Sequence, residues 1–178
     1  MLIRIVVCVA MAGARIGELA YSRRNLATAG RTTEGSWSQR TYPLIVAVHS
    51  YTILNTLIRG GKVRPSWLAL LLAVQPLRAW VLATLGHRWN ARAAVPEAMA
   101  VETGGPYAYV RHPNYSIIAL ELLALPLAFR QRKLALTVSL ANAALIGLRL
   151  REEEAALEAL PGYREHFGEK KRFIPRVW

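Results

Sequence analysis

The stretch TYPLIVAVHSYTILNTLI, residues 41–58, decides the fold class: its 18 residues lie between Arg40 and Arg59 and include no Asp, Glu, Lys or Arg. A helix needs about 20 mostly apolar residues to cross a hydrocarbon core of ~30 Å. The apolar block at residues 66–86 meets the same requirement. Both segments therefore predict helices that cross a membrane.

Outward from this stretch, apolar blocks recur at residues 2–21, 42–58, 66–86, 114–129 and 133–150. The fourth has only about 14 strongly apolar residues, or ~21 Å of helix at 1.5 Å per residue. It must gain length from the Tyr115 side or form a shallow hairpin with the fifth block. The pattern predicts an all-α integral membrane protein of about five transmembrane helices. Residues 1–178 then form one membrane domain, with amino-terminal helices over 1–84.

Composition limits the classes of partner. The chain is 53% apolar, carries a formal charge of +12 and has one cysteine, Cys8. A nucleic-acid binder would gather its Lys and Arg in a stripe, whereas here they fall between apolar blocks, so no nucleic-acid partner is expected. A single cysteine excludes an internal disulfide, and Cys8 is interpreted as packing. The histidines at 49, 87, 112 and 166 lack metal-ligand spacing, and no metal site is predicted.

The first block has two interpretations. Residues 1–14 have an early arginine, an apolar centre and a small-residue end, AGA, which is typical of a cleaved secretory signal. Against this, ARIGELAYSRRN continues a helical pattern past the cleavage point, with Arg15 and Glu18 at i,i+3. We expect a retained first helix.

Charge placement predicts the orientation. With a cytoplasmic carboxyl terminus, residues 22–41, 87–113 and 149–178 face the cytoplasm. The fourteen cations of these segments are Arg23, Arg24, Arg31, Arg40, Arg88, Arg92, Arg111, Arg149, Arg151, Arg164, Lys170, Lys171, Arg172 and Arg176. The seven on the other side are Arg4, Arg59, Lys62, Arg64, Arg130, Arg132 and Lys133. This bias follows the positive-inside rule and puts GPYAYVRHPNY (105–115) on the same face as the charged tail.

GPYAYVRHPNY has the chemistry of an anion site. Pro113 suits the first turn of a helix, so Arg111 and His112 should lie at the amino terminus of the fourth block. Free backbone N–H groups and the helix dipole attract anions there, and Arg111 adds a planar cation. Tyr107, Tyr109 and Tyr115 offer faces for a cation or an adenine ring. The alternative is an interfacial belt of aromatics and arginines.

The fifth block ends in LRLREEEAALEAL, where Arg149 and Glu153 are i,i+4 on one helical face. One interpretation is a solvated helix with internal ion pairs of about 0.2–0.5 kcal/mol each. The other is a carboxylate facing a bound cation or ribose hydroxyls. An anion site and a carboxylate on one side suit a zwitterion with an extra positive centre, and S-adenosylmethionine is such a ligand.

GPYAYVRHPNY, RLREEEAAL and the closing YREHFGEKKRFIP together resemble the isoprenylcysteine carboxyl methyltransferase family of integral-membrane, S-adenosylmethionine-dependent enzymes. The resemblance covers residues 85–178 well and implies a methyltransferase core there, with a cytosolic cofactor pocket formed by the loop before the fourth helix and the tail. It implies cofactor contacts at Tyr107, His112, Pro113, Tyr115 and Glu153, catalytic or positioning roles for Arg111, Arg149 and Glu153, and a second cofactor carboxylate at Glu154.

Two departures from the family pattern affect the residue assignments. The tail has His166 where the family usually has a second tyrosine. Three glutamates stand where two are usual, so Glu153 is chosen over Glu152 on the positions of Arg149 and Leu157.

Polar residues inside apolar blocks are often functional. Glu18 is expected to pair with Arg15; alternatively Arg15, Glu18 and Asn25 line the entry of the acceptor. His49 is either a packed polar residue or a weak candidate for acceptor binding. Arg78 is expected to pair with Glu121, which lies in another apolar block.

The sequence therefore predicts transfer of a methyl group from S-adenosylmethionine to a lipophilic, membrane-resident acceptor. O-Methylation of a carboxylate or of a long-chain phenolic or pyrone lipid is the main expectation. The alternatives are phospholipid N-methylation, reduction with NADPH by a membrane reductase of related architecture, and a non-catalytic lipid-binding protein.

Overall fold

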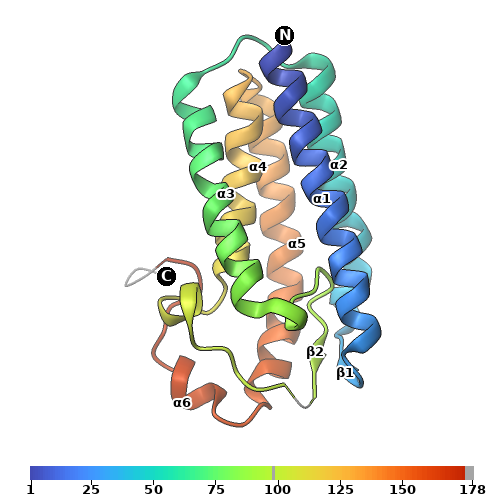
Figure 1. Cartoon of the computed structure of the whole chain (residues 1–178), viewed down its shortest axis with the longest axis vertical. Coiled ribbons are helices and arrows are strands. Elements are labelled where there is room, and N and C mark those ends of the chain that lie inside the picture. Colours follow the sequence, from blue (N-terminus) through green and yellow to red (C-terminus); the bar gives the residue numbers. More distant parts are fainter. Residues whose placement is uncertain (98, 175–178) are drawn as a thin grey trace.

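A computed structural model of the chain describes residues 1–97 and 99–174 (Figure 1). It is mostly helical, with short 3-10 turns and one two-residue strand pair. The helices are α1 (Leu2–Thr28), α2 (Ser36–Arg59), α3 (Pro65–Leu85), α4 (Pro113–Ala128), α5 (Arg132–Glu158) and α6 (Tyr163–Phe167). The other elements are η1 (Gly86–Arg88), η2 (Gly105–Ala108) and the antiparallel strands β1 (Thr32–Thr33) and β2 (Val95–Pro96).

The five long helices run side by side along the long axis of the molecule (Figure 1). The amino terminus lies at one end, and the strands, η2, α6 and the carboxyl-terminal segment lie at the other. The backbone N–H of Arg111 donates to the Lys171 carbonyl at 2.9 Å, and that of His112 donates to the Arg172 carbonyl at 2.8 Å. The predicted proximity of GPYAYVRHPNY and the tail is thus confirmed; Arg176, one of the cations counted for orientation, lies outside the described residues.

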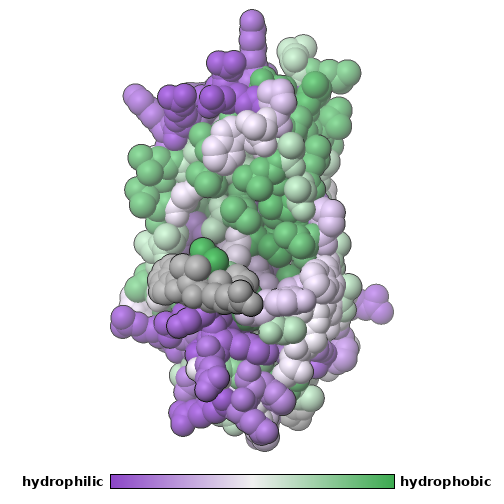
Figure 2. Space-filling model, turned by 90° about the vertical axis from the view of Figure 1, so that its left-hand side faces the viewer, coloured by the Kyte–Doolittle hydropathy of each residue, from purple (hydrophilic) through white to green (hydrophobic). Residues whose placement is uncertain are grey.

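Two helical segments are long and apolar enough to cross a membrane, Pro65–Arg88 with 24 residues and Arg132–Glu158 with 27. At 1.5 Å per residue these are about 36 and 40 Å long. Figure 2 shows hydrophobic side chains in a band between two hydrophilic ends of the molecule. Exposed leucines such as Leu72, Leu136 and Leu140 belong to these two helices. Apolar residues on the outside of a bundle are expected where the surroundings are lipid.

The short fourth helix is the centre of the bundle. α4 has 16 residues, most of them buried, including Leu122, Ala124 and Leu125. It begins at Pro113, whose fixed φ suits a first helical position and which has no N–H to leave unpaired. A turn over residues 129–131 joins it to α5. Of the two alternatives for this short block, the structure shows the hairpin with the fifth apolar block.

The first helix is unbroken from Leu2 to Thr28, passing straight through the AGA that a signal peptidase would cut. Cys8 is a free, buried thiol, as predicted for a packing residue. The polar pair Arg15 and Glu18 lies on the part of this helix that faces the other helices. The interpretation as a retained helix agrees with these contacts.

Candidate active site

A cavity of about 560 Å³ lies between α1, α2, α3, α4 and α5, and residues 88–91, 93–96 and 99 line it at its polar end. Small-molecule sites usually measure ~300–1,000 Å³. Of the residues predicted to bind cofactor or act in catalysis, those that line it are Tyr107, Arg111, His112, Tyr115, Arg149 and Glu153. The loop before α4 and the end of α5 therefore meet at one cavity.

Arg149 is the least satisfied cation of the site. It is 3% exposed, its Nη2 donates to the Ala91 carbonyl at 2.9 Å, and its guanidinium lies 5.8 Å from the centre of the Tyr115 ring. Its Nε is buried without a hydrogen-bond partner among residues 1–97 and 99–174. The expected pairing of Arg149 with Glu153 is wrong, since that carboxylate bonds elsewhere. A buried guanidinium without a carboxylate is suited to bind an anion.

Glu153 accepts a hydrogen bond from the Tyr115 hydroxyl and lines the cavity. Burial, followed by the charge of Glu153, raises the pKa of Tyr107 well above its usual range. That hydroxyl is therefore a neutral donor at any physiological pH. Tyr115 also stacks on His112, with ring centres 5.5 Å apart. Aromatic faces, a carboxylate and a guanidinium thus share one end of the cavity.

The start of α4 differs from the expected anion site. The N–H groups of Arg111 and His112 already donate to carbonyls of the tail. The Arg111 side chain also bonds the tail, from Nε to the Lys170 carbonyl at 2.7 Å and from Nη2 to the Gly168 carbonyl at 3.0 Å. The tail therefore occupies donors that the sequence assigned to a ligand. Arg111 lines the cavity while holding the tail in place.

Glu154 holds the tail to α4 and does not line the cavity. Its carboxylate accepts three hydrogen bonds from Arg172, the shortest at 2.7 Å, and lies 3.3 Å from Nε2 of His112. Arg111 approaches the same carboxylate at 3.8 Å. Pro113 is likewise buried outside the cavity lining, as the first residue of α4. In this structure both residues shape the site and do not face it.

Glu152 differs from Glu153 and Glu154, because it binds the first turn of α2. One of its carboxylate oxygens accepts the backbone N–H groups of Trp37 at 2.8 Å and of Ser38 at 3.3 Å, and the other accepts the Ser36 hydroxyl at 3.1 Å. These are orphan donors of the first turn of α2. A Cβ at Gly35 would collide with this carboxylate, so the residue before the helix has no side chain. Glu152 thus caps α2 and does not line the cavity.

A network of charged side chains lies on the cavity wall in the middle of the bundle. Arg78 bonds Glu18 through Nε at 2.9 Å and Nη2 at 2.6 Å. Arg15 bonds Glu18 at 2.9 Å and Glu121 at 3.4 Å. The expected pair of Arg15 with Glu18 is confirmed, whereas the expected pair of Arg78 with Glu121 is wrong. Gln75 donates to Glu121 at 3.1 Å instead.

Two guanidinium groups and two carboxylates balance in this network. The remaining Nη1 of Arg78 donates to the Asn114 side-chain oxygen at 3.0 Å, which links the network to the first turn of α4. Sequence reasoning missed Gln75 and Asn114, although a glutamine in the middle of one apolar block and an asparagine at the start of another are a signal of buried polar contacts. The Arg15, Glu18, Arg78 and Asn114 side chains all line the cavity.

His49 and Asn25, the remaining candidates for acceptor binding, lie in different surroundings. His49 lines the cavity; its Nδ1 lies 2.9 Å from the Ile45 carbonyl, and its Nε2 is buried without a partner among the described residues. Asn25 does not line the cavity. It donates to the carbonyls of Gly86 at 3.2 Å and Trp89 at 2.7 Å. Asn25 therefore positions the loop after α3, and the expectation that it lines the acceptor's entry is wrong.

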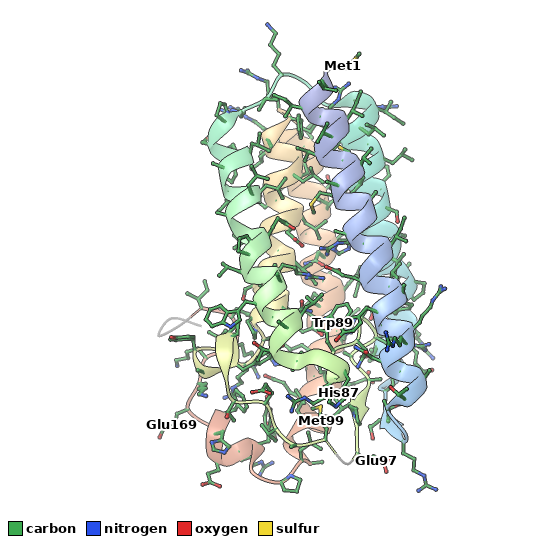
Figure 3. The ribbon with its side chains drawn as sticks, viewed as in Figure 1. Met1, His87, Trp89, Glu97, Met99 and Glu169 are labelled. Carbon is green, nitrogen blue, oxygen red and sulfur yellow. The ribbon has the colours of Figure 1, made fainter. Side chains whose placement is uncertain are left out.

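Trp89 was not identified from the sequence, yet it closes the polar end of the cavity. Its ring is buried and stacks on Tyr21 with centres 6.1 Å apart, and the Arg78 guanidinium lies 6.0 Å from its centre. Figure 3 shows Trp89 near His87 and Met99, at the end of the molecule opposite Met1. A tryptophan directly after an apolar block was the available signal, because such residues often mark an interface.

The other end of the cavity is apolar and lies between α1 and α2. Its walls include Val9 and Ile16 of α1 and Leu54 of α2. These three side chains are also exposed on the outside of the bundle. The cavity therefore reaches the lateral surface between the two helices. Among the described residues no group of His, Cys, Asp and Glu side chains is arranged to hold a metal ion.

Comparison with known proteins adds a family to this geometry. The profile of the isoprenylcysteine carboxyl methyltransferase (ICMT) family matches residues 67–159. The chain is also 30% identical over 151 residues to "Uncharacterized protein YpbQ" of Bacillus subtilis (strain 168), an alignment that covers 81% of this chain and 90% of that protein.

Proposed function

The chain belongs to the isoprenylcysteine carboxyl methyltransferase family, and from that premise we propose that it transfers a methyl group from S-adenosylmethionine to an oxygen of a lipophilic acceptor held in the membrane. Residues 1–178 act as one membrane domain of five spans, with the transfer core in residues 85–178 and the polar end of the cavity facing the cytoplasm. The observation that carries the proposal is the cavity of about 560 Å³, which joins a charged, aromatic end to an apolar end open between two helices.

The charged end has the groups that S-adenosylmethionine requires. The Arg149 guanidinium, whose Nε has no hydrogen-bond partner among the described residues, would bind the cofactor carboxylate. Glu153, with Tyr115 beside it, would bind the ammonium or the ribose hydroxyls. Tyr107 and His112 supply aromatic surface for the adenine. When bound, S-adenosylmethionine supplies a methyl group activated by a positively charged sulfur.

The apolar end suits the acceptor. A lipid tail between α1 and α2 would remain in contact with the hydrocarbon of the bilayer, because Val9, Ile16 and Leu54 face both the cavity and the surroundings. The reacting head group would then lie toward the charged end. Burying an apolar chain contributes about 0.8 kcal/mol per CH₂ group, so a long tail needs few polar contacts to bind.

The protein positions the acceptor and the cofactor and excludes water from the cavity. Methyl transfer requires the acceptor oxygen, the methyl carbon and the sulfur in line, and good alignment lowers such a barrier by about 7–11 kcal/mol. Glu154 and Arg111 hold the tail across the start of α4, and Trp89 closes the loop side. The network of Arg15, Glu18 and Arg78 fixes α1 and α3 relative to one another. These contacts hold the charged end and the apolar end of the cavity in a fixed position relative to one another.

The decisive experiment incubates the purified protein in detergent with radiolabelled S-adenosylmethionine and a total lipid extract. Label in a stable methyl ether or an alkali-labile ester supports the proposal. Label in an amine would point to a phospholipid N-methyltransferase instead. An absence of transfer, together with calorimetry that detects no binding of S-adenosylhomocysteine, would contradict the proposal and leave a reductase or a lipid-binding protein as the function.

A further inference from the structure

His49 is the buried nitrogen base that the proposed cofactor site leaves unused. Its Nδ1 lies 2.9 Å from the Ile45 carbonyl, which can only accept a hydrogen bond, so Nδ1 carries the proton. Nε2 is then a lone-pair acceptor. It is buried, has no partner among residues 1–97 and 99–174, and belongs to a side chain that lines the main cavity. A buried acceptor without a donor is costly unless something fills the place.

The surroundings of His49 keep it neutral. The charged groups near it come from three other helices: Arg15 and Glu18 from α1, Arg78 from α3 and Glu121 from α4. Their two positive and two negative charges pair with each other. A positive charge on His49 would thus be unpaired in a region of low dielectric constant, which is unfavourable. The imidazole is therefore neutral before transfer. The positive charge that it takes up during transfer appears as the sulfonium loses its own, so the net charge in the cavity stays the same.

The same balance of charges favours a hydroxyl over a carboxylate as the ligand group beside His49. A carboxylate beside His49 would meet a lone pair and no unmatched cation, because both arginines are engaged by Glu18 and Glu121. A hydroxyl is neutral and supplies the donor that Nε2 lacks. His49 also lies one turn after Ile45, which packs against the cluster containing Tyr115. Both side chains line the same cavity as Tyr115.

We infer that Nε2 of His49 binds the hydroxyl of a phenolic or enolic lipid acceptor and takes its proton during transfer. As the acceptor oxygen forms its bond to the methyl carbon, the O–H bond breaks and the proton passes to Nε2. The methyl–sulfur bond breaks with its electron pair kept by sulfur, which leaves a methyl ether, a neutral thioether and an imidazolium that returns its proton to water. This inference rests on the proposed methyl transfer and names the class of acceptor.

Two substitutions separate a base from a packing residue. His49→Phe keeps aromatic bulk and removes the acceptor atom, while His49→Gln keeps polarity without basicity. The probes are a pentadecyl phenol and its more acidic nitro derivative. A general base contributes about 10²- to 10⁴-fold, so both variants should slow methylation of the alkyl phenol by that factor. The nitrophenol, which ionises more easily, should be slowed much less. Equal slowing of both probes, or of neither, would overturn the inference.

A second measurement needs no methyl transfer. Binding of the nitrophenol to the protein without cofactor should shift its absorption band to longer wavelength, because its hydroxyl donates to Nε2. The shift should be absent in both His49 variants and present in the control His87→Gln, a histidine that is exposed and outside the cavity lining. A His49-dependent shift without any methylation would support binding of the hydroxyl to Nε2, and it would contradict both the proton transfer and the proposed function.

The carboxylate alternative has its own probe, N-acetyl-S-farnesylcysteine. Methylation of this carboxylate by the parent protein, with both phenols left unmethylated and no spectral shift, would overturn the inference and leave the proposed methyl transfer standing. If neither shift nor transfer is observed with any probe, both are contradicted. Retained binding of S-adenosylhomocysteine shows that each variant is folded.

Discussion

Replacing Arg149 by methionine tests the cofactor site most directly. Methionine preserves much of the length and apolar volume of the side chain, while it removes the guanidinium that lies unpaired at the charged end of the cavity. A hydrogen bond to a charged group contributes roughly 1.5–3 kcal/mol. Loss of the bond to the cofactor carboxylate should therefore weaken binding about 10- to 150-fold.

The assay for Arg149→Met is calorimetry with S-adenosylhomocysteine and with its decarboxylated analogue. The parent protein should bind the decarboxylated compound more weakly by about the same 10- to 150-fold, and Arg149→Met should bind both compounds equally. The control is Arg151→Met, which removes an exposed cation two residues further along α5. If Arg149→Met still discriminates between the two compounds as the parent does, the carboxylate lies elsewhere and the reasoning is refuted.

Three further outcomes are expected. Glu153→Gln should weaken S-adenosylhomocysteine binding about tenfold or more. Glu152→Gln should leave this binding unchanged and lower the free energy of unfolding by ~1 kcal/mol through the lost cap of α2. The opposite result would exchange the roles of the two glutamates. Glu18→Leu should lower the free energy of unfolding by about 3–5 kcal/mol, because it leaves the buried Arg78 without its carboxylate partner. Thermal unfolding of Glu158→Gln, at an exposed ion pair, is the comparison. A reporter fused to the carboxyl terminus should be active in the cytoplasm; activity only outside would contradict the assigned orientation.

Hydropathy alone predicted the long helices and the short fourth one, because the period and length of apolar blocks reflect local requirements of a helix. The structure gives 16 residues to α4, and its hairpin with α5 follows from that shortness. The resemblance to the family also implied one pocket for Tyr107, Tyr115 and Glu153, and all three side chains line one cavity. Such residues lie at the ends of helices that adjoin each other, so the order of elements is enough to bring them together.

Partners across the bundle could not be predicted in the same way. Arg78 and Glu121 were matched because each was a lone charge in an apolar block, yet Arg78 pairs with Glu18 at 2.6 Å. Which carboxylate a buried arginine meets depends on the rotation and depth of each helix, and hydropathy does not specify either. The same limit applied to Arg111, whose donors are taken by the carbonyls of Gly168 and Lys170. Backbone acceptors of an irregular tail leave no trace in sequence spacing.

The three adjacent glutamates Glu152, Glu153 and Glu154 point in different directions in the structure, which the sequence alone did not specify. Successive residues of an α-helix point about 100° apart, given 3.6 residues per turn, so three adjacent glutamates must face three directions. Glu152 faces the start of α2, Glu153 faces Tyr115 and the cavity, and Glu154 faces His112 and the tail. Only one of the three can therefore contact a ligand in the cavity. The other two fix α2 and the tail to the same turn of α5, and a shift of one residue in this run would disturb all three contacts together.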